Sequence, residues 1–240
     1  VGSYDIALGS GNKAGNYSIT FAQDNDAYEI TRRSLTLTGL TVSDKTYNRD
    51  TDATVSSWGS FSNVVGDDQV SLNVDSANVA FDNRNYGTQS VTITGLSLDG
   101  TDATNYSIAD QTSAATINKF ELDLGLTADN KVYDGDADAV VTAAPNVFTG
   151  DYVSVTFDAA FSNEHVANNK IISLTNLSLT GADSSNYLLP ATPSVTANIT
   201  ARPLILTYTA ENRVYDGSTD ATGSSSSRML GSVISVCASA

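Results

Sequence analysis

A short acidic run in the middle of the chain has the residue types of a calcium-binding loop. Asp134, Asp136 and Asp138 place three carboxylates at alternate positions around Gly135. Calcium takes six to eight oxygen ligands, and a turn of this kind can supply several of them. Aspartate side chains also accept hydrogen bonds from nearby backbone N–H groups and so form Asx-turns. The run is interpreted first as such a turn, and Asp134, Asp136 and Asp138 are candidate calcium ligands.

Residue sets that support catalysis are missing from the sequence. His165 is the single histidine, and it lies in a polar stretch typical of a surface loop. No zinc-ligand spacing, phosphate-binding glycine loop or nucleophile–histidine–acid set occurs in the chain. Carboxylates are plentiful, but a glycosidase needs one pair of acids across a cleft rather than the same acids in every copy. We therefore expect no enzymatic activity and no cofactor apart from the calcium ion considered above.

The overall charge excludes two classes of partner. The chain has 27 acidic and 12 basic residues, for a formal net charge of −15. Such a chain repels phosphate backbones and anionic lipid headgroups, so neither nucleic acid nor a membrane surface is an expected partner. The longest apolar runs are a few residues, far below the roughly 20 that a membrane-spanning helix needs. The single cysteine, Cys237, rules out a disulfide within the chain.

Three sequence markers recur along the chain in one order, which indicates tandem repeats. The first is a Lys/Arg-x-Tyr-x-x-x-x-Asp-Ala block, whose tyrosines are spaced by 86 residues (47 to 133) and 82 residues (133 to 215). The second, Gly-x-Asp-x-x-Asn-Tyr, ends at Tyr106 and Tyr187. In the third, an isoleucine stands five residues before a leucine, at Ile30, Ile117 and Ile199.

These markers divide the chain into four parts. Residues 1–33 are read as the C-terminal part of a preceding repeat, 34–120 and 121–202 as complete repeats, and 203–240 as the start of a further repeat with a non-matching end. The joints are short, and Pro203 stiffens one of them. Joints of this length favour an elongated rod over a flexible string of domains. The incomplete ends suggest either a fragment of a longer parent or strand exchange between chains, and we favour the fragment.

Within a repeat the apolar residues alternate with polar ones, which is typical of half-buried strands. Alternation is clear over 122–126 and 153–157, and a one-residue slip near Gly95 and Asn176 predicts a β-bulge or a strand that crosses between sheets. About seven short strands in each unit predict an all-β fold of tandem β-sandwich-like repeats of about 82–87 residues. A β-grasp-like repeat, with a short helical turn before Tyr106 and Tyr187, is the alternative.

Aromatic residues at repeated positions are expected to lie in the core of each repeat. A tyrosine buried this way keeps its hydroxyl near a strand edge. Trp58 occurs in one repeat alone, so it is either a surface aromatic or a local binding feature. A lysine–asparagine crosslink is disfavoured because the motif lysine becomes Arg213 in the last block. The tyrosines expected in the core are Tyr17, Tyr47, Tyr106, Tyr133, Tyr187 and Tyr215.

The Lys-Val-Tyr-Asp-Gly-x-x-Asp-Ala block at 131–139 resembles the YDG repeats of very large bacterial surface proteins. The opening segment, 4–35, resembles the end of the related MBG repeats. The resemblance implies filamentous-haemagglutinin-like exported adhesins, and it implies no catalytic residues. The first block departs from the pattern, because Asn48-Arg49 replaces Asp-Gly, which puts any function of Asp134 and Gly135 in doubt.

Together these observations favour a structural function. We expect stalk repeats of a secreted bacterial surface adhesin or extracellular fibre, located outside the cell at the bacterial surface. The expected partners are neighbouring repeats or copies of the same chain, and host or environmental glycan or protein. The alternative is a glycan- or protein-binding module stabilised by calcium.

Overall fold

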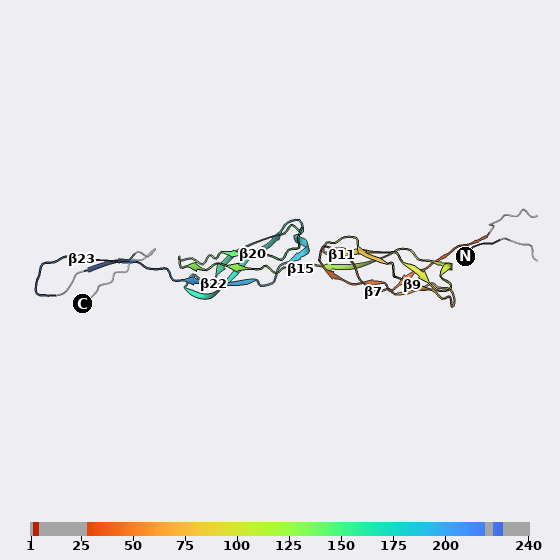
Figure 1. Ribbon diagram of the computed structural model, residues 1–240, viewed down its shortest axis with the longest axis horizontal. Helices are drawn as coiled ribbons and strands as arrows, with labels where there is room; N and C mark the ends of the chain where they lie inside the picture. The colour runs from red at the N-terminus through yellow and green to blue at the C-terminus, as the bar shows by residue number, and fades with distance from the viewer. Residues whose placement is uncertain (1, 5–27, 219–222, 228–240) are drawn as a thin grey trace, which may run out of the picture. The chain divides into compact units, whose positions relative to one another are not determined.

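The computed structural model describes residues 2–4, 28–218 and 223–227 (Figure 1). The chain divides into two compact units. Unit 1 consists of residues 1–122 together with two loops of the second repeat, 147–153 and 181–189. Unit 2 consists of the rest, residues 123–146, 154–180 and 190–240. The compact units thus differ from the sequence repeats, because two loops of the second repeat pack with the first.

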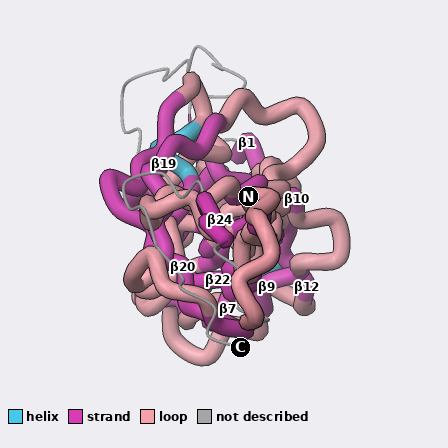
Figure 2. Tube along the Cα trace, turned by 90° about the vertical axis from the view of Figure 1, so that its left-hand side faces the viewer, coloured by secondary structure: helices cyan, strands magenta, loops and turns pink. Residues whose placement is uncertain are grey.

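Nearly all the regular structure is strand, and the only helices in the described ranges are two single turns (Figure 2). This confirms the all-β prediction. The turns are the 3-10 helices η1 (Ala103–Asn105) and η2 (Ser184–Asn186), and they lie where the β-grasp-like alternative placed short helical turns before Tyr106 and Tyr187. No helix of the described residues is long and apolar enough to cross a membrane.

Unit 1 contains short strands and two longer ones. Their bounds are β1 (Gly2–Tyr4), β2 (Tyr28–Ile30), β3 (Arg33–Ser34), β4 (Leu37–Thr38), β5 (Thr41–Val42), β6 (Lys45–Thr46), β7 (Val55–Ser57), β8 (Ser60–Phe61), β9 (Ser71–Asn73), β10 (Asn78–Phe81), β11 (Gly87–Thr94), β12 (Ser97–Asp99), β13 (Tyr106–Ser107), β14 (Gln111–Asn118), β15 (Phe120–Glu121) and β21 (Tyr187–Leu188). Unit 2 contains β16 (Thr127–Ala128), β17 (Lys131–Val132), β18 (Val141–Thr142), β19 (Ser154–Phe161), β20 (Ala167–Thr180), β22 (Ser194–Thr200), β23 (Leu206–Ala210) and β24 (Gly223–Ser227).

Both repeats contain a four-stranded sheet with the same topology. The strand order is β10-β11-β14-β6 in the first repeat and β19-β20-β22-β17 in the second. In each sheet the last pair is parallel and brings the motif lysine opposite a buried isoleucine, Lys45 opposite Ile117 and Lys131 opposite Ile199. This pairing explains why the isoleucine marker and the lysine of the motif recur in step.

The predicted slip near Gly95 and Asn176 is present in both repeats but takes two forms. In the first repeat the chain changes sheets at Gly95, since β11 pairs with β10 and β14 whereas β12 pairs with β9. In the second repeat β20 continues through Asn176, and its register with β19 shifts between Thr156 and Asp158. Gly95 and Asn176 both have positive φ, 74° and 51°, which turns the strand at these points.

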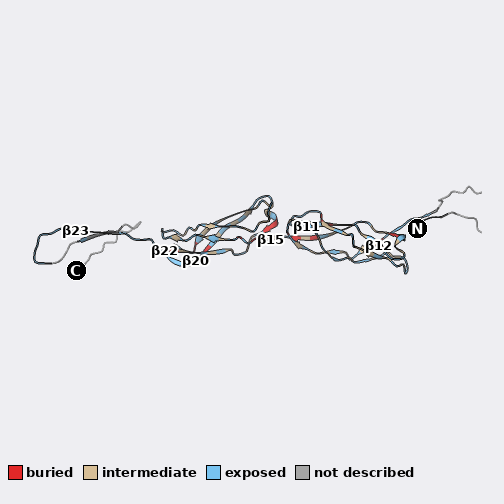
Figure 3. Cartoon of the chain, viewed as in Figure 1, coloured by how far each residue is buried: buried red, intermediate tan, exposed pale blue. Residues whose placement is uncertain are grey.

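The core of each repeat lies on one face of its four-stranded sheet, where side chains at alternate strand positions are buried. In the second repeat the core consists of Phe161, Ile172, Ala197 and Ile199. In the first repeat the corresponding buried residues are Phe81, Val91, Ala115 and Ile117. Buried positions lie along β11 and β14 in the first repeat and along β20 and β22 in the second, and Figure 3 shows them in red. Each repeat thus has its own small core.

Candidate functional site

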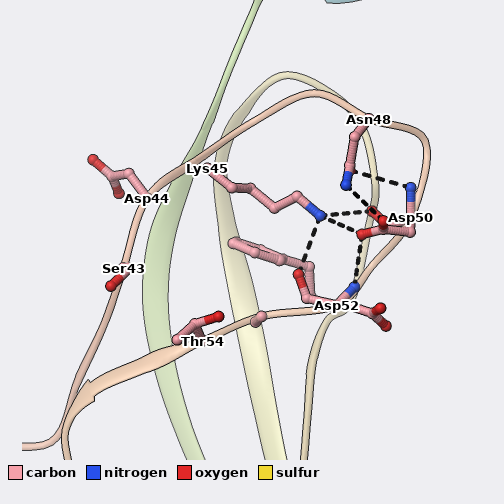
Figure 4. A pocket seen from close by; sticks show the side chains of 9 residues that line it. Ser43, Asp44, Lys45, Asn48, Asp50, Asp52 and Thr54 are labelled. Atoms are coloured by element: carbon pink, nitrogen blue, oxygen red, sulfur yellow. Dashed lines mark hydrogen bonds and ion pairs between the residues drawn. The ribbon is translucent and has the colours of Figure 1, made fainter. Parts of the chain in front are cut away.

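The acidic loop of the first motif is organised around a lysine. The ammonium of Lys45, at the start of β6, bonds the Asp50 carboxylate and the backbone carbonyls of Asp50 and Asp52, the latter at 3.1 Å (Figure 4). The Asp50 carboxylate in turn accepts the Asp52 N–H at 3.1 Å. The hydrogen bond from Lys45 holds the pKa of Asp50 below its usual range. The loop is therefore closed by an internal cation.

The candidate calcium ligands of the second motif surround Lys131 in the same way. The Lys131 ammonium lies 2.9 Å from Asp134 Oδ1 and 2.5 Å from Asp136 Oδ1. The same ammonium donates to the backbone carbonyl of Asp138 at 3.1 Å, not to its carboxylate. Asx-turns are also present, since Asp134 accepts the Asp136 N–H and Asp136 accepts the Asp138 N–H. The geometry therefore supports the structural turn, with lysine at its centre.

In the third motif an arginine takes the place of the lysine at the centre of the loop. Arg213 contacts Asp216 at 3.0 Å and the backbone carbonyl of Ser218 at 2.6 Å. The Asp216 carboxylate accepts the Ser218 N–H at 3.0 Å, as the Asp134 carboxylate accepts the Asp136 N–H in the second loop. A basic residue two positions before the tyrosine is thus the common element, and either lysine or arginine can supply it.

Calcium should leave the stability of the chain unchanged, because Lys131 already neutralises Asp134 and Asp136. In the described ranges, no group of three or more His, Cys, Asp or Glu side chains could hold a metal ion. A ligand at a hundred times its Kd stabilises a fold by about 2.7 kcal/mol, which a melting curve detects easily. Melting curves with calcium and with a chelator should therefore coincide. A melting temperature that rises with calcium would restore Asp134, Asp136 and Asp138 as ligands.

The glycine of the Tyr-Asp-Gly motif has a conformational role. Gly135 has φ of 94°, in the left-handed region that glycine adopts without steric penalty. A Cβ at Gly135 would meet nothing within 4 Å, so the backbone conformation and not crowding favours glycine there. In the first motif this position is Arg49, with φ of 74°. A non-glycine residue in this region costs roughly 1–2 kcal/mol, so Arg49 needs a compensating interaction.

Tyr47 is buried by the following repeat. Only 1% of its surface is exposed, and its ring makes edge-on contacts with two aromatic rings. Both rings belong to the second repeat's loops within unit 1: Phe148, at 6.0 Å between ring centroids, and Tyr187, at 5.6 Å. Phe120 at the joint packs on Phe148 at 4.7 Å. Tyr47 therefore closes a junction between repeats, and its burial depends on residues 147–153 and 181–189.

The polar centre of this junction is Asp151, whose side chain is fully buried. Its Oδ2 accepts hydrogen bonds from the hydroxyl of Tyr47 at 2.7 Å and from that of Tyr187 at 2.6 Å. Its Oδ1 lies 2.8 Å from Arg49 Nε. The Tyr187 hydroxyl also accepts the Phe148 N–H at 3.1 Å. A buried carboxylate is costly unless it is paired and hydrogen-bonded, and here it is both.

Arg49 explains the departure of the first motif from Tyr-Asp-Gly. Besides Asp151, its guanidinium bonds the carbonyl oxygen of Thr149. Gly150 leaves room for it, since a Cβ there would lie 2.9 Å from the Arg49 side chain. The ion pair and this hydrogen bond compensate for the left-handed backbone of Arg49. The substitution of glycine by arginine is thus a feature of this particular junction.

A second contact of the junction uses a loop of the first repeat. The N–H of Tyr86 donates to Asn186 Oδ1 at 2.8 Å, and Asn186 Nδ2 donates to Asn85 Oδ1 at 3.3 Å. Asn186 belongs to η2 and is almost fully buried. Tyr86 also lies under the Lys119 ammonium, at 4.8 Å from its ring centroid. Asn186 and Tyr187, the Asn-Tyr pair of the second repeat, therefore both take part in the junction.

The first repeat has the counterpart of the Asp151 turn at its other end. The Tyr106 hydroxyl donates to Asp68 Oδ2 at 2.6 Å and accepts the Val65 N–H at 3.0 Å. The hydrogen bond to Asp68 raises the pKa of Tyr106. Tyr106 and Tyr187 thus lie in the core, as predicted, and hold an aspartate of a neighbouring turn. The aspartates themselves were not singled out from the sequence, although a Gly-Asp turn recurs at Gly66 and Gly150.

The prediction that every motif tyrosine lies in its own repeat's core is wrong. Tyr133 is 38% exposed and Tyr215 is 89% exposed, while Tyr47 is buried. The first two loops begin alike, because the Tyr133 N–H donates to Thr200 O as the Tyr47 N–H donates to Asn118 O. Among the described residues, cover from a following repeat reaches Tyr47 and neither Tyr133 nor Tyr215. Tyr17 lies outside the described residues.

Alkaline pH should weaken the Tyr47 junction. Burial and the hydrogen bond to Asp151 raise the pKa of Tyr47 from 10.0 to about 12. Below pH 10 the phenol is protonated in both folded and unfolded chains, and its stabilisation is complete. Above pH 10 the unfolded chain loses this proton first, so stability falls as pH rises toward about 12. Melting temperatures of the wild type and Tyr47→Phe, compared from about pH 9 to about pH 12, should converge. Parallel curves would contradict this.

Two other residues singled out in the sequence take no part in the junction. His165 is exposed and lies 3.6 Å from the neighbouring Glu164 carboxylate. Trp58 is half-buried in the turn between β7 and β8.

The repeats match a known domain type in both copies. The YDG domain matches residues 31–114 and again residues 118–196. The chain belongs to the YDG family. No curated protein and no solved structure matches it. Tyr47 and Tyr133 fall within the two matched ranges, and Tyr215 lies outside them.

Proposed function

We propose that this chain supplies structural stalk repeats of a secreted bacterial surface adhesin or extracellular fibre, without catalysis. The observation that carries the proposal is the buried junction at Asp151, where one repeat's motif tyrosine is held by the next repeat. Such a contact fixes how adjacent domains join, which a load-bearing or spacing array requires. A binding domain on a flexible linker has no need of it.

The composition of the junction supports a permanent contact rather than a transient one. Four aromatic rings pack together around Asp151, and they exclude water from its carboxylate. Charged hydrogen bonds of this kind are directional, so they hold the loops 147–153 and 181–189 in one orientation against Tyr47 and Arg49. The acidic net charge of −15 keeps a long exposed array soluble. The resemblance of the motif to repeats of exported adhesins supports the proposal that the array lies outside the cell.

Spin-label distances test the mechanical part of the proposal. With Cys237→Ser, labels at exposed Asp75 and Thr180 should give a narrow distance distribution in the wild type. Tyr47→Ala should broaden it, because the junction loses its aromatic anchor. Tyr152→Ala is the matched control, since Tyr152 is 76% exposed and outside the aromatic cluster. A broad distribution in the unmodified junction would contradict a stalk.

Surface labelling tests the location. An antibody raised against residues 31–196 should label intact, unpermeabilised cells of the source bacterium, and protease treatment of those cells should remove the signal. Labelling that appears only after permeabilisation would contradict an extracellular role.

A further inference from the structure

The second repeat ends in the same surface that the first repeat uses to hold its neighbour, but this surface is open. We define the donor end of the second repeat as Tyr133 to Gly135 together with residues 163–166. Its motif loop is closed by Lys131 just as the first loop is closed by Lys45. Tyr133 is nevertheless 38% exposed, and Val166 within the donor end and Val132 beside it are exposed as well. In the part of the chain that the structure describes, the donor end is therefore formed and has no cover.

The first repeat presents the complementary surface. We define its receiver end as residues 65–68 together with residues 105–106. Asp68 accepts the Tyr106 hydroxyl at 2.6 Å, as Asp151 accepts the Tyr187 hydroxyl at 2.6 Å. Val65 stands where Phe148 stands in the junction, since its N–H bonds the Tyr106 hydroxyl as the Phe148 N–H bonds that of Tyr187. Val65 is 49% exposed.

We propose that the donor end of the second repeat binds the receiver end of the first repeat in a second copy of this chain, head to tail. In this contact the Tyr133 hydroxyl donates to Asp68, and the Tyr133 ring packs on Val65. The proposal rests on the proposed stalk function, because it extends the same junction from one chain to the next. The Tyr47 junction in unit 1 is the model for this contact, because there the motif tyrosine of one repeat already bonds the aspartate of the next.

The residues also set the strength of this contact below that of the Tyr47 junction. Gly135 replaces Arg49, so Asp68 gains a hydroxyl donor but no ion pair. Val65 replaces Phe148, so Tyr133 loses an aromatic neighbour. A head-to-tail contact that does not close on itself produces open chains of variable length. Association should therefore be reversible and should grow with concentration.

Sedimentation velocity of the full chain over a wide concentration range tests the proposal. The wild-type weight-average mass should rise with concentration, and Tyr133→Ala and Val65→Glu should each abolish the rise. Both residues are exposed, so both variants should keep the wild-type melting temperature. Tyr152→Ala removes another exposed tyrosine, outside the two ends, and should associate like the wild type.

Mixing the two defective variants makes the test specific. A Tyr133→Ala chain keeps a receiver end and a Val65→Glu chain keeps a donor end, so the mixture should form one-to-one dimers and nothing longer. A wild type that stays monomeric, variants that associate normally, or a mixture that stays monomeric would each overturn the proposal. If association fails while the spin-label distances remain narrow, the stalk function stands and only this contact is wrong.

Discussion

Tyr47→Ala should lower the free energy of unfolding of unit 1 by about 3–5 kcal/mol, whereas Tyr133→Ala should change that of unit 2 by less than about 1 kcal/mol. The two tyrosines hold the same place in the YDG motif. Tyr47 is fully buried among aromatic rings, so its loss leaves a cavity and a carboxylate without one of its donors. Tyr133 has no such cover, so truncating it removes little buried surface.

Denaturant unfolding of the full chain, followed by hydrogen exchange of 147–151 for unit 1 and of β20 for unit 2, measures both effects. Tyr47→Phe is the control, since it keeps the ring packing and removes only the hydrogen bond to Asp151. It should cost about 1.5–3 kcal/mol, as for a hydrogen bond to a charged group. Equal effects of Tyr47→Ala and Tyr133→Ala would show that each tyrosine belongs to its own repeat's core.

Asp151→Ala should destabilise unit 1 by about 3 kcal/mol. The change removes the acceptor for two tyrosine hydroxyls and the partner of Arg49, and each buried polar group left without a partner costs about 1–3 kcal/mol. Two features limit the total. The Tyr187 hydroxyl keeps its bond from the Phe148 N–H, and Arg49 is about one-third exposed, so water can replace part of the lost ion pair.

Asp68→Ala is the matched control for this second prediction. Asp68 holds the Tyr106 hydroxyl with the same geometry but is paired with no arginine among the described residues. It should therefore cost about 1 kcal/mol. Thermal unfolding of both variants decides the comparison, and an Asp151→Ala chain no less stable than the Asp68→Ala chain would contradict the junction.

Local sequence patterns were sufficient to predict the repeats and much of their fold. The burial of Leu122 and Leu124 follows the period of two, and the slip at Gly95 and Asn176 marks a change of sheet in one repeat and a bulge in the other. These features depend on residues close together along the chain. Alternation and glycine positions therefore carry enough information to predict them.

The candidate site could not be predicted in the same way, because it joins distant residues. Tyr47 and Asp151 are 104 positions apart, and the hydrogen bond between them depends on how two repeats dock. A repeated tyrosine is compatible with an internal core and with a recurring junction. The useful signal was the Gly150-Asp151 turn and the Asn186-Tyr187 dipeptide of the second repeat, which together form the surface that receives Tyr47.

The role of Arg49 in the first motif could not be predicted from the sequence either. Asn48-Arg49 looked like a loss of the Asp-Gly pattern and so weakened any functional reading of these positions. In the structure, Arg49 holds a buried carboxylate from the next repeat. A departure from a family pattern can thus be a local adaptation of one junction.

Tyrosine nitration followed by peptide mass spectrometry tests the central claim most directly. If the following repeat buries the motif tyrosine, Tyr133 and Tyr215 should react quickly in the folded full chain and Tyr47 should be protected. Asp151→Ala should increase the reactivity of Tyr47 and leave that of Tyr133 unchanged. Equal reactivity of Tyr47 and Tyr133 in the wild type, or a Tyr47 that stays protected in Asp151→Ala, would contradict the claim that the YDG tyrosine is a junction residue.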